Sequence, residues 1–281
     1  MNRLLSPQTP SQSPALCLRT HSDGTIPLNC SPLDLFNQAA PRFDNLYLQS
    51  KHDFARLVAI IEPPTLDWVE IGSFAYSPDH RFILHPAATS QLLSRVQHCD
   101  CCGSPGRVEL RNEHGQERLQ LCAPNQIPAY QWGRYVQALS QTKMPVPATG
   151  TPRPFPRIPG NTTELPFHPF LLATLLSLLS DQGRSVEVTL VNEVSSNRRP
   201  LKPDIVEVED TLLTCSSPLS SLQLDLAAVE KLSLALTAKG APQLYASGPD
   251  RSQLLLLEAA DTPEDRRALT DILHDHIPEL I

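Results

Sequence analysis

The segment that decides the fold is Arg81-Phe82-Ile83-Leu84-His85-Pro86-Ala87-Ala88, in which a short apolar run leads into Ala-Ala. A second segment, Leu222-Gln223-Leu224-Asp225-Leu226-Ala227-Ala228-Val229, has a similar pattern about half a chain later. Short apolar runs of this kind are typical of strands. Two such segments indicate that one plan of elements occurs twice in the chain.

The elements around the first segment form a mixed set. The sequence predicts strands over 57–62, 67–76 and 81–85 and a helix over 87–96. Residues 107–111 and 117–122 flank Asn112-Glu113-His114-Gly115, whose glycine can adopt positive φ, and this arrangement predicts a hairpin. A helix over 130–139 ends the set.

The elements around the second segment follow a similar order. A helix over 170–180 stops at Asp181-Gln182-Gly183, and strands are expected over 185–191, 205–209, 211–215 and 221–226. The run 232–236 fits either a strand or a helix. A hairpin over 243–258 with a turn at Ser247-Gly248-Pro249-Asp250 matches the earlier hairpin, and a helix again follows.

Composition indicates the domain boundaries. Residues 1–31 combine Ser, Pro, Thr and Gln, which predicts a mobile N-terminal segment without an element. The segment 145–169 contains eight prolines, including one at each end, and predicts a linker without helix or strand, because proline lacks an N–H group. We therefore expect two similar α+β lobes, 32–144 and 170–281, each an antiparallel sheet flanked by helices, from an internal duplication. Any two α+β lobes share short strands and a final helix, which is the alternative.

Charge and hydropathy exclude several classes of partner. The formal net charge of −7 gives no general attraction to phosphate backbones, so nucleic acid is not expected as a partner. The longest apolar run, 167–179, is interrupted and too short to insert as a membrane-spanning helix. The first 14 residues lack the apolar region of a secretory signal, and we expect a cytoplasmic protein with seven mostly reduced cysteines.

A group of cysteines suggests one metal site. Cys99-x-x-Cys102-Gly has the spacing of a zinc knuckle, since both thiolates can reach one tetrahedral ion. A second knuckle is missing from the sequence. The remaining ligands would have to come from Cys122 and from His98 or His114, and ordinary loop thiols are the alternative interpretation.

No catalytic motif stands out, and the question of enzymatic activity stays open. Neither Gly-x-Ser-x-Gly nor a phosphate-cradling glycine loop occurs. The one local basic patch is Arg198-Arg199-Pro200-Leu201-Lys202, which we expect in an exposed turn over 197–203. Its guanidinium groups suit a carboxylate, although most such turns are simply solvated.

The order of features over 57–140 resembles the haem-utilisation carrier and degrading proteins of the ChuX and HemS type. The resemblance rests on Trp68-Val69-Glu70-Ile71-Gly72-Ser73-Phe74, on His80-Arg81-Phe82-Ile83-Leu84, and on the turn with Glu113 and Gly115. Leu110 and Arg111 stand where the family has an aromatic pair. The match extends more loosely to the second set of elements.

The resemblance implies a sheet-based lobe that holds haem in an apolar cleft, often duplicated within a chain or across a dimer. Haem needs an apolar slot, an axial side-chain ligand and cations for its propionates. The candidate ligands are His80, His85 and Tyr76. The candidate propionate partners are Arg81, Arg198 and Arg199.

The leading hypothesis is therefore a cytoplasmic haem-binding or haem-handling protein. One alternative is a non-enzymatic adaptor that keeps the fold without a cofactor and binds a protein partner through its proline-rich segments. The other is a small zinc-binding protein that uses the cysteine cluster. Haem degradation has no required sequence signature, because that chemistry belongs to the cofactor.

Overall fold

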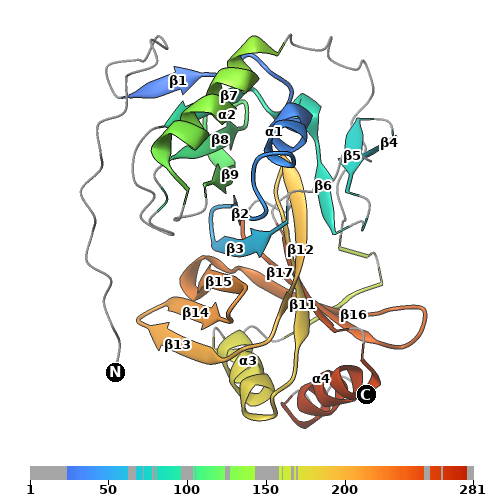
Figure 1. Cartoon of the computed structure of the whole chain (residues 1–281). Helices are drawn as coiled ribbons and strands as arrows, with labels where there is room; N and C mark the ends of the chain where they lie inside the picture. The colour runs from blue at the N-terminus through green and yellow to red at the C-terminus, as the bar shows by residue number, and fades with distance from the viewer. Residues whose placement is uncertain are drawn as a thin grey trace, which may run out of the picture.

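The structure is a computed structural model, and it describes most of the chain from residue 24 to residue 276. The described residues are 24–62, 68–71, 73–77, 79, 81–95, 104, 106–123, 127–142, 158, 159, 161–165, 168, 170–249, 254–260 and 262–276. Within them the strands form two antiparallel sheets, and helices cover both, so the predicted α+β class is confirmed (Figure 1).

Sheet A and sheet B each contain nine strands among the described residues. In order across the sheet, sheet A consists of β1 (Thr25–Pro27), β7 (Gln91–Arg95), β8 (Arg107–Arg111), β9 (Glu117–Cys122), β2 (Leu46–Lys51), β3 (Ala55–Ile61), β15 (Ser220–Asp225), β14 (Leu212–Ser216) and β13 (Ile205–Glu209). Sheet B consists of β10 (Thr163–Glu164), β16 (Lys231–Leu236), β17 (Pro242–Ser247), β18 (Leu254–Ala259), β11 (Val186–Val191), β12 (Ser195–Leu201), β6 (Phe82–Leu84), β5 (Phe74–Tyr76) and β4 (Val69–Ile71).

The two sheets share one strand order. The order β1-β7-β8-β9-β2-β3 of sheet A returns as β10-β16-β17-β18-β11-β12 in sheet B, and three strands from the other half of the chain complete each sheet. Strand β3 pairs with β15, and β12 pairs with β6. Each crossing strand runs into a 3₁₀ turn, η1 (Pro86–Ala88) or η2 (Leu226–Ala228), at the two segments that the sequence singled out. Neither sheet is therefore built from one half of the chain alone.

Four helices bury the inner faces of the sheets within the described residues. Helices α1 (Pro32–Ala39) and α2 (Ala129–Gln141) lie at one end of the molecule, and α3 (Leu171–Asp181) and α4 (Pro263–His276) lie at the other (Figure 1). The first pair packs in a core with Phe36 and Trp132, and the second in a core rich in leucine. Burial of these apolar faces is the main stabilising contribution to the fold.

A capping box fixes the start of α1. The Ser31 side chain accepts a hydrogen bond from the Leu33 N–H group at 3.2 Å, and the Asp34 carboxylate accepts one from the Ser31 N–H group at 2.9 Å. These contacts satisfy N–H groups that have no partner within the helix.

Most predicted elements are present. The hairpin of β8 and β9, the helices α2 and α3, the strands β11, β13, β14 and β15, and the hairpin of β17 and β18 are confirmed. Gly115 adopts φ +73° in the first hairpin, as its turn requires. The ambiguous run 232–236 belongs to strand β16.

Four predictions are wrong. The described residues of 87–96 do not form an α-helix, because only η1 is helical and β7 then pairs with both β1 and β8. The described residues of 67–76 include two antiparallel strands, β4 and β5, rather than one strand. The segment 1–31 contains β1, and the segment 145–169 contains β10, which pairs with β16. Neighbouring strands supply the hydrogen bonds in these cases, and local composition does not reveal such neighbours.

We expect the substitution Gly106→Ala to destabilise the protein by about 1–3 kcal/mol, because it overpacks a filled core. A Cβ atom at Gly106 would lie 2.1 Å from Nε1 of the buried Trp132. Urea unfolding measures the effect. In a Trp132→Leu background the cost of Gly106→Ala should shrink, and an unchanged cost would show that the indole is not the obstacle.

Candidate functional site

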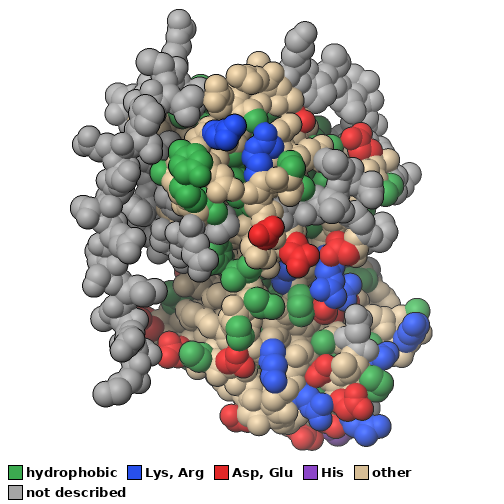
Figure 2. Space-filling model, viewed as in Figure 1, with side chains coloured by type: hydrophobic (Ala, Val, Ile, Leu, Met, Phe, Trp, Pro, Cys, Tyr) green, Lys and Arg blue, Asp and Glu red, His purple; other side chains and the backbone are tan. Residues whose placement is uncertain are grey.

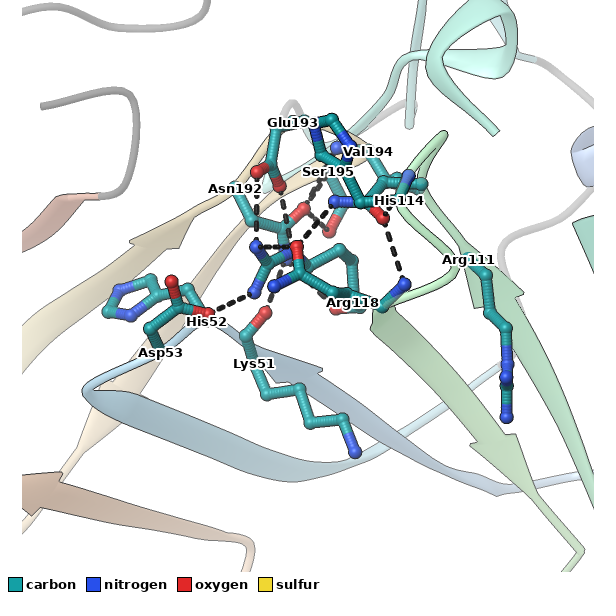
Figure 3. A network of polar contacts seen from close by, with 12 residues as sticks. Lys51, His52, Asp53, Arg111, His114, Arg118, Asn192, Glu193, Val194 and Ser195 are labelled. Atoms are coloured by element: carbon teal, nitrogen blue, oxygen red, sulfur yellow. Dashed lines mark hydrogen bonds and ion pairs between the residues drawn. The ribbon is translucent and has the colours of Figure 1, made fainter. Parts of the chain in front are cut away.

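Three hairpin turns meet around the buried side chain of Arg118, which is 3% exposed. Its Nη1 atom donates to the Asp53 carboxylate at 2.8 Å, and its Nη2 atom donates to Gln116 Oε1 at 2.7 Å (Figure 3). Its Nε atom lies 2.9 Å from Glu193 Oε2. One guanidinium therefore ties together the turns after β2, β8 and β11, which are far apart in the sequence.

Asn192 connects the same turns through its side-chain amide. Its Nδ2 atom donates to the carbonyl oxygens of Lys51 and Arg118 at 3.0 and 2.9 Å. Its Oδ1 atom accepts from the N–H groups of Val194 and Ser195 at 2.9 and 2.8 Å (Figure 3). This fully bonded amide fixes the backbone that carries Glu193.

The backbone carbonyl of Glu193 sets the tautomer of the His85 imidazole. The His85 Nδ1 atom lies 3.2 Å from the Glu193 carbonyl oxygen. A carbonyl oxygen can only accept a hydrogen bond, so the proton sits on Nδ1 and the neutral ring has its lone pair on Nε2. Burial lowers the pKa of His85 below 6.5, and the contact with Glu193 offsets this only in part. His85 is therefore a neutral imidazole of the kind that binds metals.

His85 belongs to the outer face of sheet B, the face opposite the helices. Phe82, Leu84 and Ala75 point into the core with α1, so the alternate residues of β5 and β6 point outward. Phe74 lies across the pair from His85, with ring centroids 4.7 Å apart. Tyr76 lies opposite Ile83 on the same face.

Arg81 and Arg198 lie farther along this face and share one acidic partner. The Arg198 N–H group donates to the Arg81 carbonyl oxygen at 2.8 Å, which places the two residues side by side. Their guanidinium groups lie 3.8 and 3.3 Å from the buried Glu187 carboxylate, and Arg198 also reaches Glu258 at 3.7 Å. Both side chains remain about 40% exposed, at 40% and 39%.

The predicted exposed turn over 197–203 is wrong, because most of it lies in β12 between β11 and β6. By strand alternation Arg199 points to the opposite face from Arg198. Burial lowers the pKa of Arg199 to about 10, while the nearby Asp79 carboxylate acts in the other direction. The structure thus brings Tyr76, Arg81, His85 and Arg198 to one face and separates Arg199 from them.

An apolar patch continues the outer face of sheet B. The patch consists of buried residues, and Ile158 packs against it. The residues are Val191, Ala235, Tyr245, Leu254 and Leu256. Sheet A has charged or polar groups at the matching strand positions. Lys51, Arg95 and Glu109 stand where sheet B has Val191, Ala235 and Tyr245. The two outer faces are therefore chemically different.

The charged face of sheet A centres on Glu109, which is 1% exposed. Arg95 and Arg107 lie 2.9 Å from one of its carboxylate oxygens, and Arg111 lies 2.7 Å from the other. Burial raises the pKa of Glu109, but hydrogen bonds from Arg111 and Arg107 and the charge of Arg95 outweigh it, so the pKa lies below 4.5. Glu109 is therefore ionised at neutral pH.

The proposed set of zinc ligands does not assemble from its described members. His114 lies in the turn at one end of the β8–β9 hairpin and is 72% exposed, whereas Cys122 is fully buried opposite Arg107 at the other end. A strand of this length spans roughly 17–20 Å, too far for one ion. His98, Cys99 and Cys102 lie outside the described residues, as does His80. No group of three or more potential ligands occurs in the part of the chain that the structure describes.

Sequence reasoning did not identify Arg118, Asn192, Glu193 or Phe74 as site residues. Asn192-Glu193 sits between two strands, which signals a turn but not its contacts. Arg118 lies within a strand of otherwise ordinary pattern, and its partners come from three separate turns. No local signal in the sequence could have found them.

Comparison with known proteins identifies the fold. A crystal structure of ChuS, described as an E. coli heme oxygenase, matches 91% of this chain and 89% of its own, with a TM-score of 0.69 and 10% sequence identity. The holo form of PhuS, a heme-binding protein from Pseudomonas aeruginosa, matches 88% of this chain and 86% of its own, with a TM-score of 0.70 and 10% identity. The chain has the fold of ChuS and PhuS.

The likeness to ChuS and PhuS covers both sheets, since nearly the whole chain is matched. It agrees with the resemblance to haem-utilisation proteins that the sequence indicated. No protein-family model matches the sequence. No curated protein is significantly similar to it in sequence. At this identity the comparison defines the fold, and the site must be argued from the residues of this chain.

Among the described residues, no helix has the length and apolar character that crossing a membrane requires.

We expect Arg118→Met to destabilise the protein by about 2 kcal/mol, because it removes charge-assisted hydrogen bonds and leaves Glu193 without its cation. Thermal unfolding measures the loss. The matched control is Arg267→Met on the exposed side of α4, which should change the midpoint little. Equal effects of the two substitutions would contradict a structural role for the Arg118 contacts.

Stability should fall in acid partly through Glu109. Because its folded pKa is lower than its unfolded value of about 4.5, the ionised group stabilises the folded state above that pH, and this contribution is lost as the pH falls through the folded pKa. In Glu109→Gln this part of the pH dependence should be absent. Urea unfolding at several pH values between 7 and 3 tests it, and parallel curves for the two proteins would refute it.

Proposed function

We propose that this protein binds haem on the outer face of sheet B, with His85 as the axial ligand. The observation that carries the proposal is a neutral imidazole whose Nδ1 proton faces the Glu193 carbonyl oxygen, so that Nε2 is the ring nitrogen that would coordinate iron. Metal-bound histidines commonly have such a second contact, which orients the ring. The names of the similar structures, a heme oxygenase and a heme-binding protein, support the choice of ligand.

The other groups that haem requires occur on the same face. Apolar side chains for the porphyrin come from Phe74, Tyr76 and Ile83 and from the patch around Tyr245. Arg81 and Arg198 provide cations for the propionates, and their partly exposed guanidinium groups remain accessible to a ligand. Phe74 covers the imidazole of His85, so haem binding displaces this ring.

We propose one haem for each chain. The matching face of sheet A has Lys51, Arg95 and Glu109 in place of apolar residues, and a porphyrin placed there would have to desolvate these charged groups. At the matching positions of sheet B, Val191, Ala235 and Tyr245 are uncharged, so this cost is absent there. We therefore expect one haem to bind to each chain, even though the strand order occurs twice.

We propose further that the repeated strand order comes from an internal duplication, with the halves divided within 145–169. Its support is the match of every strand of one half to a strand in the other, together with η1 and η2 at equivalent places. The lobe boundaries at 32–144 and 170–281, the cytoplasmic location and the absence of a nucleic-acid partner stay predictions.

A haemin titration of the purified chain tests the function, with absorbance recorded across the Soret region. We expect saturation at one equivalent and a shifted Soret band in His85→Ala, because the iron loses its nitrogen ligand. His114→Ala, which changes an exposed turn histidine, is the matched control and should leave the spectrum unchanged. Albumin serves as the nonspecific standard.

Two further results would separate the parts of the proposal. The double substitution Arg81→Gln with Arg198→Gln should weaken haemin binding at least tenfold. It should not move the Soret maximum, since the iron ligand is intact. An unsaturable response of the unmodified chain would refute haem binding. A saturable response with an identical spectrum in His85→Ala would keep haem binding and overturn the ligand, and His80→Ala and Tyr76→Phe then test the other two candidates.

A further inference from the structure

The hairpin of β13 and β14 exposes an unusual amount of apolar surface. Of the eight large hydrophobic side chains that are exposed among the described residues, four lie between 205 and 219. Ile205 at 54%, Val208 at 40% and Leu212 at 42% lie on this hairpin, and Leu219 at 66% lies in the next turn, between β14 and β15. Single exposed apolar residues are normal on a protein surface, but a group of them on one hairpin marks an interaction surface.

The same hairpin is acidic. Asp204, Glu207, Glu209 and Asp210 are all exposed, and Lys202 is the basic residue nearby. These five residues sum to a charge of about −3 at neutral pH. In Figure 2, acidic and hydrophobic side chains lie next to each other in the lower left part of the surface, where Figure 1 has β13 and β14.

Strand β13 is also the edge of sheet A, so its outer backbone groups have no neighbouring strand within the described part of the sheet. Of the four edge strands, β13 is the longest, with five residues. Strands β1 and β4 have three residues and β10 has two, and β1 ends in a proline. A short strand and proline are two usual means of protecting an edge, and β13 has neither; it has the charged side chains of Glu207 and Glu209 instead.

The edge is held in place by its inner side. Val206 is partly buried against the core that contains α3 and α4. Strand β13 pairs with β14 along its whole length, from Ile205 opposite Ser216 to Glu209 opposite Leu212. A preorganised edge of this kind loses little conformational freedom when another strand joins it.

A second copy of this chain is a poor occupant of the edge. If two β13 strands paired antiparallel about their centre, Glu207 would face Glu207, and each Glu209 would lie opposite an Ile205. Like charges directly opposite each other destabilise a strand pair. The acidic side chains therefore discourage self-pairing and at the same time favour a strand with lysine or arginine.

We propose that the β13 edge binds an extended, basic segment of a partner protein, which adds a tenth strand to sheet A. Backbone hydrogen bonds along about 17 Å of strand provide the pairing. Ile205 and Val208, which lie on opposite faces of β13, contact apolar side chains of the added strand, and the four carboxylates attract its lysine or arginine residues. The surface lies on sheet A and is independent of the proposed haem site on sheet B.

Three fluorescent peptides test the proposal by anisotropy against the full chain at low salt. The probe alternates lysine with valine over ten residues. The second peptide has the same charge but has proline in place of two central valines, which prevents strand pairing. The third replaces lysine by glutamate. We expect saturable binding of the probe alone, at least tenfold tighter than either other peptide and weakened by salt.

Matched charge reversals locate the binding. Glu207→Lys with Glu209→Lys should weaken the probe at least tenfold. Glu264→Lys with Asp271→Lys on the exposed side of α4 makes the same change in net charge and should have little effect. Circular dichroism and the urea midpoint of each variant confirm folding. Hydrogen exchange should slow at backbone amides of 205–209 when the probe is added, and not when the proline peptide is added.

Several results would overturn the proposal. No binding of the lysine-valine peptide, or equal binding of the proline peptide, would exclude strand addition. Equal losses in the two charge-reversal variants would mean that net charge alone attracts the peptide. Concentration-dependent dimerisation in sedimentation that Glu207→Lys with Glu209→Lys abolishes would assign the edge to a second copy of the chain instead.

Discussion

The structure depends on the strand pairs that join the two halves of the chain. Strand β15 adds to β3, and β6 adds to β12, so each sheet is completed by strands from the other half. Backbone N–H and C=O groups buried at these positions must be hydrogen-bonded, and only the other half supplies the partners. Each half of the chain therefore depends on the other to complete its sheet. The same exchange carries Tyr76, Arg81 and His85 onto sheet B.

The turns beside these pairs decide what the outer face of sheet B can do. Arg118 and Asn192 hold the turn that contains Glu193, and Glu193 holds the tautomer of His85. His85, from the first half of the chain, is thus oriented by a turn of the second half. Arg118, also from the first half, fixes that turn. Such a network is stable because nearly every polar group in it has a partner.

Repetition of the strand order did not preserve chemistry. At matched positions one outer face has Val191 and Tyr245, and the other has Lys51 and Glu109. The half-buried arginines around the buried Glu109 make sheet A polar at positions where sheet B is apolar. The edges differ as well, because β13 is longer and more acidic than β4. These differences are why we propose different ligands for the two sheets, a planar apolar cofactor for sheet B and a basic peptide strand for sheet A.

The sequence alone predicted the elements that local patterns control: the α+β class, the β8–β9 hairpin with Gly115 in its turn, the pairing of β17 with β18, helices α2 and α3, and the two strand-to-Ala-Ala segments. It also singled out His85, Arg81 and Arg198. Strand pairing, which local patterns do not reveal, makes 91–95 a strand, puts Arg198 within sheet B, and turns Arg199 to the face of the sheet opposite Arg198. The reason is physical: periodicity reflects which side of an element is apolar, whereas strand pairing and the meeting of Arg118, Glu193 and His85 depend on partners distant in the chain.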